Sequence, residues 1–306
     1  MRFSILSKTR IWFSFSILLS LVSLFFLFAP GFGLPLGIDF TGGTELEISF
    51  VNTTPPKEKM TEIFDTAVGA DRGLKVIEEQ GGRTFLLRSH LVSPVEQVKL
   101  LEAIKTQNFV PTLERVSSVG PTLGVYFKKQ AFWAISVTIL AIVSFVAWAF
   151  RSVPQGISSW KFGMATVVAL LHDVLLISGF FAVLGRFIDI EVDSLFVTAV
   201  LTVLGFSVHD TIVVFDRLRE NLKGKKVKDF SLLAENSLWQ TMGRSLHTST
   251  SAVLVLVALL IMGPSSIFAF VLALAFGIVV GTYSSILIAV PLLVIWQKDA
   301  HIGSLD

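Results

Sequence analysis

Long apolar runs dominate the hydrophobic pattern of this chain, and short polar stretches separate them. Six runs are long enough to cross a hydrocarbon core of about 30 Å, which takes about 20 helical residues. The pattern therefore predicts a polytopic α-helical membrane protein with six transmembrane helices. We place the predicted spans at Ile11–Ala29, Ala131–Phe150, Phe162–Leu184, Ser194–Phe215, Leu246–Met262 and Ile267–Trp296.

The first run has basic residues before it, as both a signal peptide and a membrane anchor do. These are Arg2, Lys8 and Arg10. The apolar run is long for a signal peptide, and Pro30-Gly31-Phe32 follows it in place of a small-x-small cleavage site. We therefore predict an uncleaved anchor, with a cleaved signal peptide as the alternative.

The stretch between the first two spans has the pattern of a folded domain. Leu46, Ile48 and Phe50 alternate with polar residues, which is the period of a half-buried strand. Further strands are predicted at Leu74–Glu78, Thr84–Arg88 and around Thr112–Ser118, with Gly81-Gly82 as the turn between the second and the third.

Two helices are predicted between these strands. One begins with Thr54-Pro55 as its N-cap and first-turn residue and has an apolar stripe of Met60, Ile63, Phe64, Ala67 and Val68. The other begins with the capping box Ser93-Pro94-Val95-Glu96 and would bury Val98, Leu101 and Ile104. The order β-α-β-β-α-β indicates an α+β, ferredoxin-like domain.

Basic residues in the short loops set the orientation, because cytoplasmic loops are rich in Lys and Arg. Arg151 and Lys161 flank the loop after the second span, and seven basic residues lie between the fourth and fifth spans. Both termini are therefore predicted to be cytoplasmic, with the α+β domain outside. The predicted organisation is 1–29 (N-terminus and first span), 30–129 (periplasmic domain), 130–296 (bundle of the other spans, with a basic cytoplasmic loop at 217–245) and 297–306 (cytoplasmic tail).

Composition agrees with this class and excludes several others. Hydrophobic residues make up 53% of the chain and charged residues 16%, with a mean hydropathy of +0.73. The chain has no cysteine, so disulfides and thiolate metal sites are excluded. Basic and acidic residues are interspersed in the predicted outside domain, which leaves no nucleic-acid-binding patch. No cofactor or metal site is predicted.

Charged residues inside the predicted spans are the candidates for function, because an ionisable group in the bilayer core is costly and normally faces protein or water. Asp210 lies in the fourth span and Arg244 opens the fifth. We interpret the two as a proton relay, in which Asp210 loads and releases protons and Arg244 is its conditional counter-ion. The alternative is a permanent ion pair that fixes the bundle.

Other polar residues in the spans have weaker candidacies. Asp173 is either a second relay group or a hydrogen-bonded packing residue, and His172, His209 and Thr248 are possible relay or packing neighbours. Asp216-Arg217 is expected to be a local pair at the membrane interface. Small and polar residues also form a stripe on the fourth span, which consists of Thr198, Thr202, Gly205 and His209. In the sixth span, Gly277 and Gly281 form a GxxxG pattern typical of helix packing.

Four segments together resemble the SecF family of the SecD/SecF proteins, which belong to the RND superfamily. Residues 37–44 (GIDFTGGT) resemble the signature that opens the periplasmic domain, and residues 119–124 (VGPTLG) the segment that closes it. Residues 207–217 (SVHDTIVVFDR) resemble the fourth-span motif, and residues 244–250 (RSLHTST) the start of the fifth span. The four matches occur in family order and are spread along the chain from residue 37 to residue 250.

The resemblance implies a subunit of the SecD–SecF complex in the bacterial inner membrane, which is not an enzyme. The complex would use the proton-motive force to promote translocation of unfolded preproteins through SecYEG, with YajC as an accessory and membrane lipids around it. The proton-linked aspartate and arginine of the family fall on Asp210 and Arg244. His209 stands where the family often has Asn.

Three rival functions each predict different sequence features. An RND-type proton-coupled exporter of a small lipophilic substrate would have a larger outside region and two repeats in one chain. An intramembrane hydrolase would need a metal motif or a nucleophile with its base, and nucleotide hydrolysis would need a Walker A loop; the sequence has none of these. A non-conducting scaffold subunit remains open, and sensitivity to neutralisation of Asp210 separates it from a motor.

Overall fold

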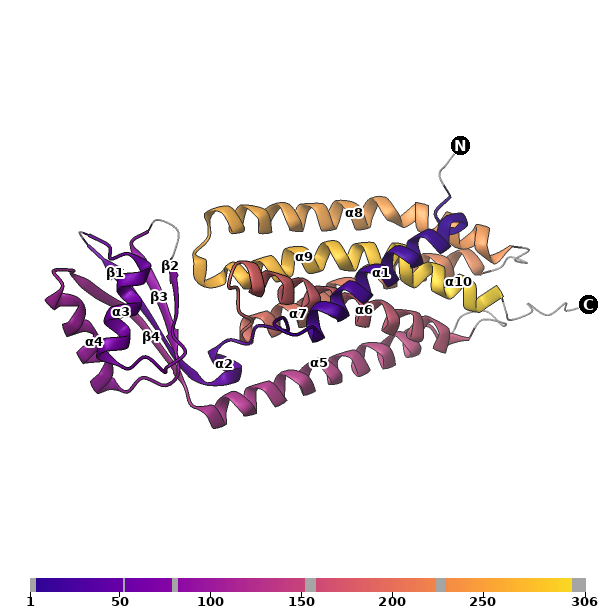
Figure 1. Ribbon diagram of the computed structural model, residues 1–306. Coiled ribbons are helices and arrows are strands. Elements are labelled where there is room, and N and C mark those ends of the chain that lie inside the picture. Colours follow the sequence, from indigo (N-terminus) through magenta and orange to yellow (C-terminus); the bar gives the residue numbers. More distant parts are fainter. Residues whose placement is uncertain (1–3, 52, 79–81, 152–157, 224–228, 299–306) are drawn as a thin grey trace, which may run out of the picture. The chain divides into compact units, whose positions relative to one another are not determined.

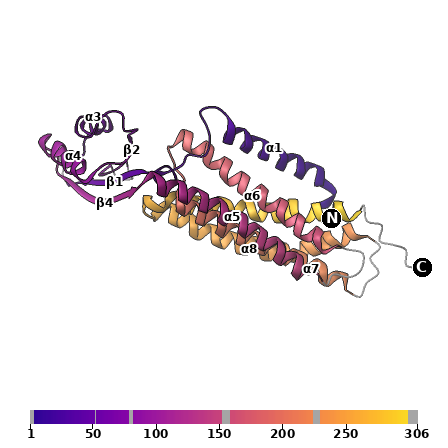
Figure 2. The same cartoon turned by 90° about the horizontal axis from the view of Figure 1, so that it is seen from below.

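The computed structural model describes residues 4–51, 53–78, 82–151, 158–223 and 229–298 (Figures 1 and 2). Within these residues six helices are long and apolar enough to cross a membrane, which agrees with the six predicted spans. The described chain folds as two compact units. The helix bundle comprises Met1–Leu34, Trp133–Ile190 and Leu195–Asp306, and the sheet domain comprises Pro35–Phe132 and Glu191–Ser194.

The six spans consist of α-helices with short 3₁₀ or π segments at their ends or inside them. The first joins a 3₁₀ turn, η1 (Leu6–Lys8), to α1 (Thr9–Phe28), and the sixth contains a π segment. The others are single helices. Their bounds are α5 (Pro121–Ala149), α6 (Ser159–Phe187), α7 (Ser194–Leu222), α8 (Phe230–Met262) and, for the sixth span after η2 (Ser265–Ile267), α9 (Phe268–Ser284), η3 (Ser285–Ala289) and α10 (Val290–Lys298).

Two of these helices begin well before the predicted spans. α5 starts at Pro121, because proline suits the first turn of a helix, where its missing N–H is not needed. α8 starts at Phe230, where the carboxylate of Asp229 accepts a hydrogen bond from Leu232 N–H (3.1 Å). Much of the predicted cytoplasmic loop is therefore helix. Its residues Lys225, Lys226 and Lys228 lie outside the described residues, as does Gly81 of the predicted turn.

Aromatic packing and one buried carboxylate hold an end of the bundle together. Phe150, Phe162 and Phe215 are fully buried, with ring centroids 5.0–6.0 Å apart. Glu235 of α8 accepts hydrogen bonds from the backbone N–H groups of Ile5 and Leu6, both at 2.8 Å. These N–H groups belong to the start of the first span and would otherwise lack acceptors. Glu235 therefore ties the first span to α8.

The sheet domain contains a four-stranded antiparallel sheet in the order β2-β3-β1-β4. Buried apolar side chains from the sheet and from helices α3 and α4 form one core, which includes Leu46, Ile48, Phe64, Leu87 and Ile104. The elements are α2 (Ile38–Thr41), β1 (Gly43–Phe50), α3 (Lys57–Ala67), β2 (Lys75–Glu78), β3 (Thr84–Ser89), α4 (Pro94–Thr106) and β4 (Pro111–Val119).

The predicted order β-α-β-β-α-β is confirmed, and so is the capping box that begins α4, where Ser93 and Glu96 bond each other's backbone N–H. Two details were wrong. The N-cap of α3 is Pro56, two residues beyond Thr54. Val98 is 56% exposed, because the face of α4 turned to the sheet is centred on Leu100 and Ile104, both fully buried.

Candidate functional site

Asp173 lies in the middle of the bundle and is completely buried. Ser207 of α7 donates its hydroxyl hydrogen to Asp173 Oδ2 (2.6 Å), and His172 Nδ1 lies 3.2 Å from Asp173 Oδ1. The other ring nitrogen of His172 is buried without a hydrogen-bond partner in the described part of the chain. Beside it is Tyr283, whose ring centroid is 5.8 Å from that of His172 and whose hydroxyl is hydrogen-bonded to Ser16 of α1.

Asp210 is another buried carboxylate of the bundle, with 2% of its surface exposed. Thr282 Oγ1 of α9 lies 3.3 Å from Asp210 Oδ2, 2.9 Å from the carbonyl oxygen of Ile278 and 2.6 Å from Ser249 Oγ of α8. Because a threonine hydroxyl has one hydrogen, these neighbours compete for it. Ser245 Oγ also lies beside Asp210, without completing a hydrogen bond.

A further pair of hydroxyls joins the surroundings of the two carboxylates. Ser285 Oγ lies 2.8 Å from Thr211 Oγ1, 2.8 Å from the carbonyl oxygen of Gly281 and 3.1 Å from that of Ser207. Ser285 is the first residue of the π segment η3, a helix irregularity that occurs frequently at functional sites. Polar groups from α6, α7, α8 and α9 therefore form a nearly continuous network inside an otherwise apolar bundle.

The structure does not pair the two residues that sequence analysis put at the centre of the site. In the residues described, no ion pair joins Arg244 to Asp210 or to any other carboxylate. Arg244 is exposed in the isolated chain and lines a cavity of about 300 Å³. The other lining residues are Val213, Asp216, Arg217, Glu220, Gln240 and Thr241.

Of the other predicted site residues, His172 belongs to the network, whereas His209 and Thr248 lie on exposed faces of α7 and α8. Asp216 and Arg217 do not pair with each other. Asp216 pairs with Arg219 (2.5 Å), and Arg217 pairs with Glu220 (2.5 Å), because residues three apart face each other on a helix.

The hydroxyl residues of the sixth span that contact the site were not predicted from the sequence. Thr282 and Ser285 lie in a run of four polar residues, 282–285, and this run was a signal that could have revealed them. The predicted packing role of the two glycines in this span is confirmed. A Cβ on Gly281 would lie 2.8 Å from Ser207 Cβ, and one on Gly277 would overlap the side chain of Val203. The close approach of α9 to α7 requires both glycines.

Comparison with known families gives two matches. A family model described as "Protein export membrane protein SecD/SecF, C-terminal" matches residues 99–299, and one described as "SecD/SecF GG Motif" matches residues 28–54.

Two similar curated proteins are both named protein translocase subunit SecF. The one from Anaerolinea thermophila is 36% identical over 297 residues, covering 96% of this chain and 94% of the relative. The one from Thermobaculum terrenum is 40% identical over 276 residues, covering 87% of this chain and 86% of the relative.

Solved structures of SecDF also match. The crystal structure of SecDF, a translocon-associated membrane protein from Thermus thermophilus, aligns with a TM-score of 0.82 and 31% identity over 97% of this chain. A second SecDF structure, in a form titled super-membrane-facing, aligns with a TM-score of 0.68 and 29% identity. The present chain spans 39% of the length of each SecDF chain. The extent of the family and curated matches identifies the chain as a member of the SecD/SecF family of protein export membrane proteins.

Proposed function

We propose that this chain is the SecF subunit of a bacterial inner-membrane protein translocase, and that it uses the proton-motive force to promote preprotein translocation through SecYEG. The names of the similar curated proteins support the translocase role. The periplasmic position of the sheet domain and its ferredoxin-like classification, the cytoplasmic termini and the accessory YajC belong to the same proposal.

The observation that carries the proton-coupled part is the setting of Asp210. Its hydrogen-bonding neighbour is a hydroxyl of Thr282, and no cation pairs with it among the described residues. A hydroxyl can donate to a carboxylate and can accept from a carboxylic acid, whereas Lys and Arg can only donate. The site can therefore serve both protonation states of Asp210 without losing its hydrogen bonds, as a relay requires.

Arg244 completes the relay as a partner that pairs with Asp210 in only part of the cycle. It lies on α8 one residue before Ser245, which faces Asp210, and it lines the cavity with Asp216 and Glu220. A movement of α8 relative to α7 would bring the guanidinium to Asp210 and favour the ionised carboxylate. The reverse movement would return Arg244 to the cavity. In the present structure Arg244 lines this cavity.

The same structure offers a surface for SecD. Thr198, Thr202, Gly205 and His209 form an exposed stripe along α7, and a Cβ on Gly205 would meet no atom within 4 Å. Polar groups are unfavourable where they face hydrocarbon, whereas small residues allow a neighbouring helix to pack closely. We assign this stripe to the contact with SecD. Gly205→Leu should fold, since the chain itself leaves room for the side chain, and yet lose co-purification with SecD. Leu140→Phe, on the exposed face of α5, is the matched control.

Pulse-chase secretion in a strain depleted of SecF tests the proton-coupled function. The strain carries wild type, Asp210→Asn or the control Asp71→Asn, an exposed carboxylate of the sheet domain, and accumulation and SecD co-purification are followed in parallel. We expect Asp210→Asn to accumulate and to hold SecD while precursors stay unsecreted, with the control close to wild type. Export by Asp210→Asn at the wild-type rate would refute the relay and leave a scaffold subunit.

A further inference from the structure

The loop between α6 and α7 folds as part of the sheet domain. Val192 N–H donates to the carbonyl of Pro35 (2.7 Å), and Gly37 N–H donates to the carbonyl of Val192 (2.8 Å). Leu36 and Val192 are thereby paired in a short parallel bridge. Val192 is fully buried. Residues 191–194 therefore form a strap that pairs with the segment entering the domain from α1.

Asp39 binds the first residue of α7. Its Oδ2 accepts hydrogen bonds from the backbone N–H (2.9 Å) and the hydroxyl (2.5 Å) of Ser194. The first N–H groups of a helix have no acceptor within the helix, and a negative charge there is favoured by the helix dipole. Asp39 thus supplies the start of α7 with an acceptor and a charge from a distant part of the sequence.

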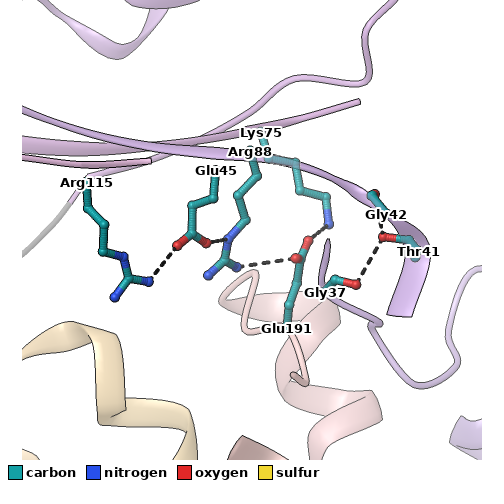
Figure 3. Close-up of polar contacts among 8 residues, drawn as sticks. All are labelled: Gly37, Thr41, Gly42, Glu45, Lys75, Arg88, Arg115 and Glu191. Atoms are coloured by element: carbon teal, nitrogen blue, oxygen red, sulfur yellow. Dashed lines mark hydrogen bonds and ion pairs between the residues drawn. The ribbon is translucent and has the colours of Figure 1, made fainter. Parts of the chain in front are cut away.

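Glu191 ties the same strap to the sheet through ion pairs (Figure 3). Its carboxylate binds Lys75 Nζ (2.5 Å) and Arg88 Nη1 (3.3 Å), and only 8% of its side chain is exposed. Arg88 Nε also binds Glu45 (2.6 Å), which binds Arg115 (3.2 Å). The chain of alternating charges takes one residue from each of the four strands, so the strap is attached to the whole sheet.

Glycines allow three segments of the sheet domain to approach one another closely. These are the segment with Gly42 and Gly43, the end of β3 at Ser89 and the start of α5 at Gly124. Gly42 and Gly43 have φ angles of +77° and +147°, which favour glycine. A Cβ on Gly43 would lie 2.5 Å from the carbonyl oxygen of Ser89. A Cβ on Gly124 would lie 2.8 Å from Gly42 N. The matched GG motif, residues 28–54, therefore contains two of the glycines, Gly42 and Gly43, that allow this close approach.

We propose that Asp39 and Glu191 make the strap and the first turn of α7 move with the sheet domain, so that Asp39 is a positioning residue for the Asp210 relay. The inference rests on the proposed function. Ser194 and Asp210 belong to one helix, α7, and lie sixteen residues apart, about 24 Å at 1.5 Å per residue. A displacement of Ser194 is therefore transmitted along a continuous helix to the Asp210 carboxylate. A displacement of Asp210 is transmitted back to the sheet domain in the same way.

The test uses the full chain with its partner subunit in the depleted strain. Asp39→Ala removes the acceptor and the charge at the start of α7. Asp71→Asn is the control, because Asp71 is exposed in the same domain and has no ion pair among the described residues. We expect Asp39→Ala to accumulate, to hold SecD and to lose several-fold in export. The lost part should be the part that a protonophore removes from wild type.

A disulfide separates loss of coupling from loss of folding. The chain has no cysteine of its own, and bridge partners such as Leu36 and Val192 suit the Cα separation that a disulfide needs. In Asp39→Ala, the added pair Leu36→Cys and Val192→Cys should restore gradient-dependent export when oxidised and lose it again on reduction. In a wild-type background the oxidised pair should leave export unchanged.

Three results would overturn the inference. They are wild-type export by Asp39→Ala, no rescue by the oxidised pair, and a loss of export in Asp39→Ala that a protonophore does not mimic. Each of these leaves the relay itself intact as long as Asp210→Asn remains defective. Wild-type export by Asp210→Asn would instead refute the relay, and with it the positioning role of Asp39.

Discussion

The sheet domain and the helix bundle bury carboxylates in opposite ways. In the sheet domain, Glu45 and Glu191 each contact two cations. In the bundle, Asp173 and Asp210 are surrounded by hydroxyl groups and a histidine, and no Lys or Arg pairs with either in the residues described. Arg and Lys can only donate, so they suit a permanent anion, whereas hydroxyl groups can satisfy a carboxyl group with or without its proton.

Glu235 shows that burial in the bundle does not by itself decide which groups surround a carboxylate. Glu235 is buried in the bundle, yet its carboxylate accepts from the backbone N–H groups of Ile5 and Leu6 (both 2.8 Å) and from Trp239 Nε1 (2.9 Å), with the Ser4 hydroxyl as a longer fourth donor (3.3 Å). The three N–H donors cannot accept a hydrogen bond in return. Glu235 therefore resembles the carboxylates of the sheet domain and serves structure. The three N–H donors of Glu235, rather than its burial, distinguish it from Asp173 and Asp210.

The largest effect is expected from neutralising the two bundle aspartates. Asp210→Asn should abolish gradient-dependent export, and Asp173→Asn should lower it by less, because Ser207 can still donate to the amide oxygen at that position. Both variants should accumulate normally. Pulse-chase secretion at matched protein levels measures the difference. Equal, wild-type export by both would remove the functional distinction between bundle and sheet carboxylates.

A stability effect is expected from the sheet domain instead. Arg88→Gln leaves Glu45 and Glu191 short of one cation each, and it should lower the free energy of unfolding by about 1–3 kcal/mol, since Arg88 is only partly exposed. Thermal unfolding of the purified complex, followed by protease sensitivity of the sheet domain, measures this. Lys59→Gln, in an exposed pair with Glu62, is the control and should change stability little.

A smaller effect on export is expected from the hydroxyl beside Asp210. Thr282→Val keeps the shape of the side chain but removes the hydroxyl that contacts Asp210 and Ser249, so export should fall several-fold. Thr282→Ser keeps the hydroxyl and should export close to the wild-type rate. If valine and serine at this position gave the same export, the hydroxyl would have no part in the relay.

The smallest effect is expected at Glu96, a partly exposed carboxylate whose hydrogen bond from the backbone N–H of Ser93 lowers its pKa below the ordinary 4.5. Because the folded pKa is the lower one, the contribution of Glu96 to stability is present above pH 4.5 and is lost as the pH falls through the folded pKa. Glu96→Gln retains a capping box and should flatten this acid dependence. Unfolding midpoints between neutral and acidic pH, compared with Glu102→Gln, check it.

Much of the fold could be predicted because its signals are local. The spans follow from apolar length, and the order of strands and helices in the sheet domain follows from residue periods and one capping box. α4 shows the limit of this approach. Val98, Leu101 and Ile104 fit a helical stripe, but the orientation of the helix on the sheet is a tertiary property, and it buries Leu100 in place of Val98.

The site could be predicted only in part. A carboxylate in an apolar span is conspicuous, so Asp173 and Asp210 were found. Thr282 and Ser285 were missed because hydroxyl residues are common in membrane helices, and even the polar run 282–285 does not show which groups it contacts. Residues 191–193 of the strap were left between two predicted spans, and Ser194 was placed in the fourth span, because the pairing of Val192 with Pro35 and Gly37 joins residues more than 150 positions apart. Such pairing leaves no local pattern in the sequence.

The most direct test of the account is an infrared titration of the purified complex, which observes the carboxyl groups themselves. The account predicts a carboxylic-acid C=O band that appears and disappears with pH, is absent in Asp210→Asn and persists in Glu45→Gln and Asp216→Asn. A spectrum in which Asp210→Asn removes no titrating band would contradict the account, because Asp210 would then keep a single protonation state and could not relay protons.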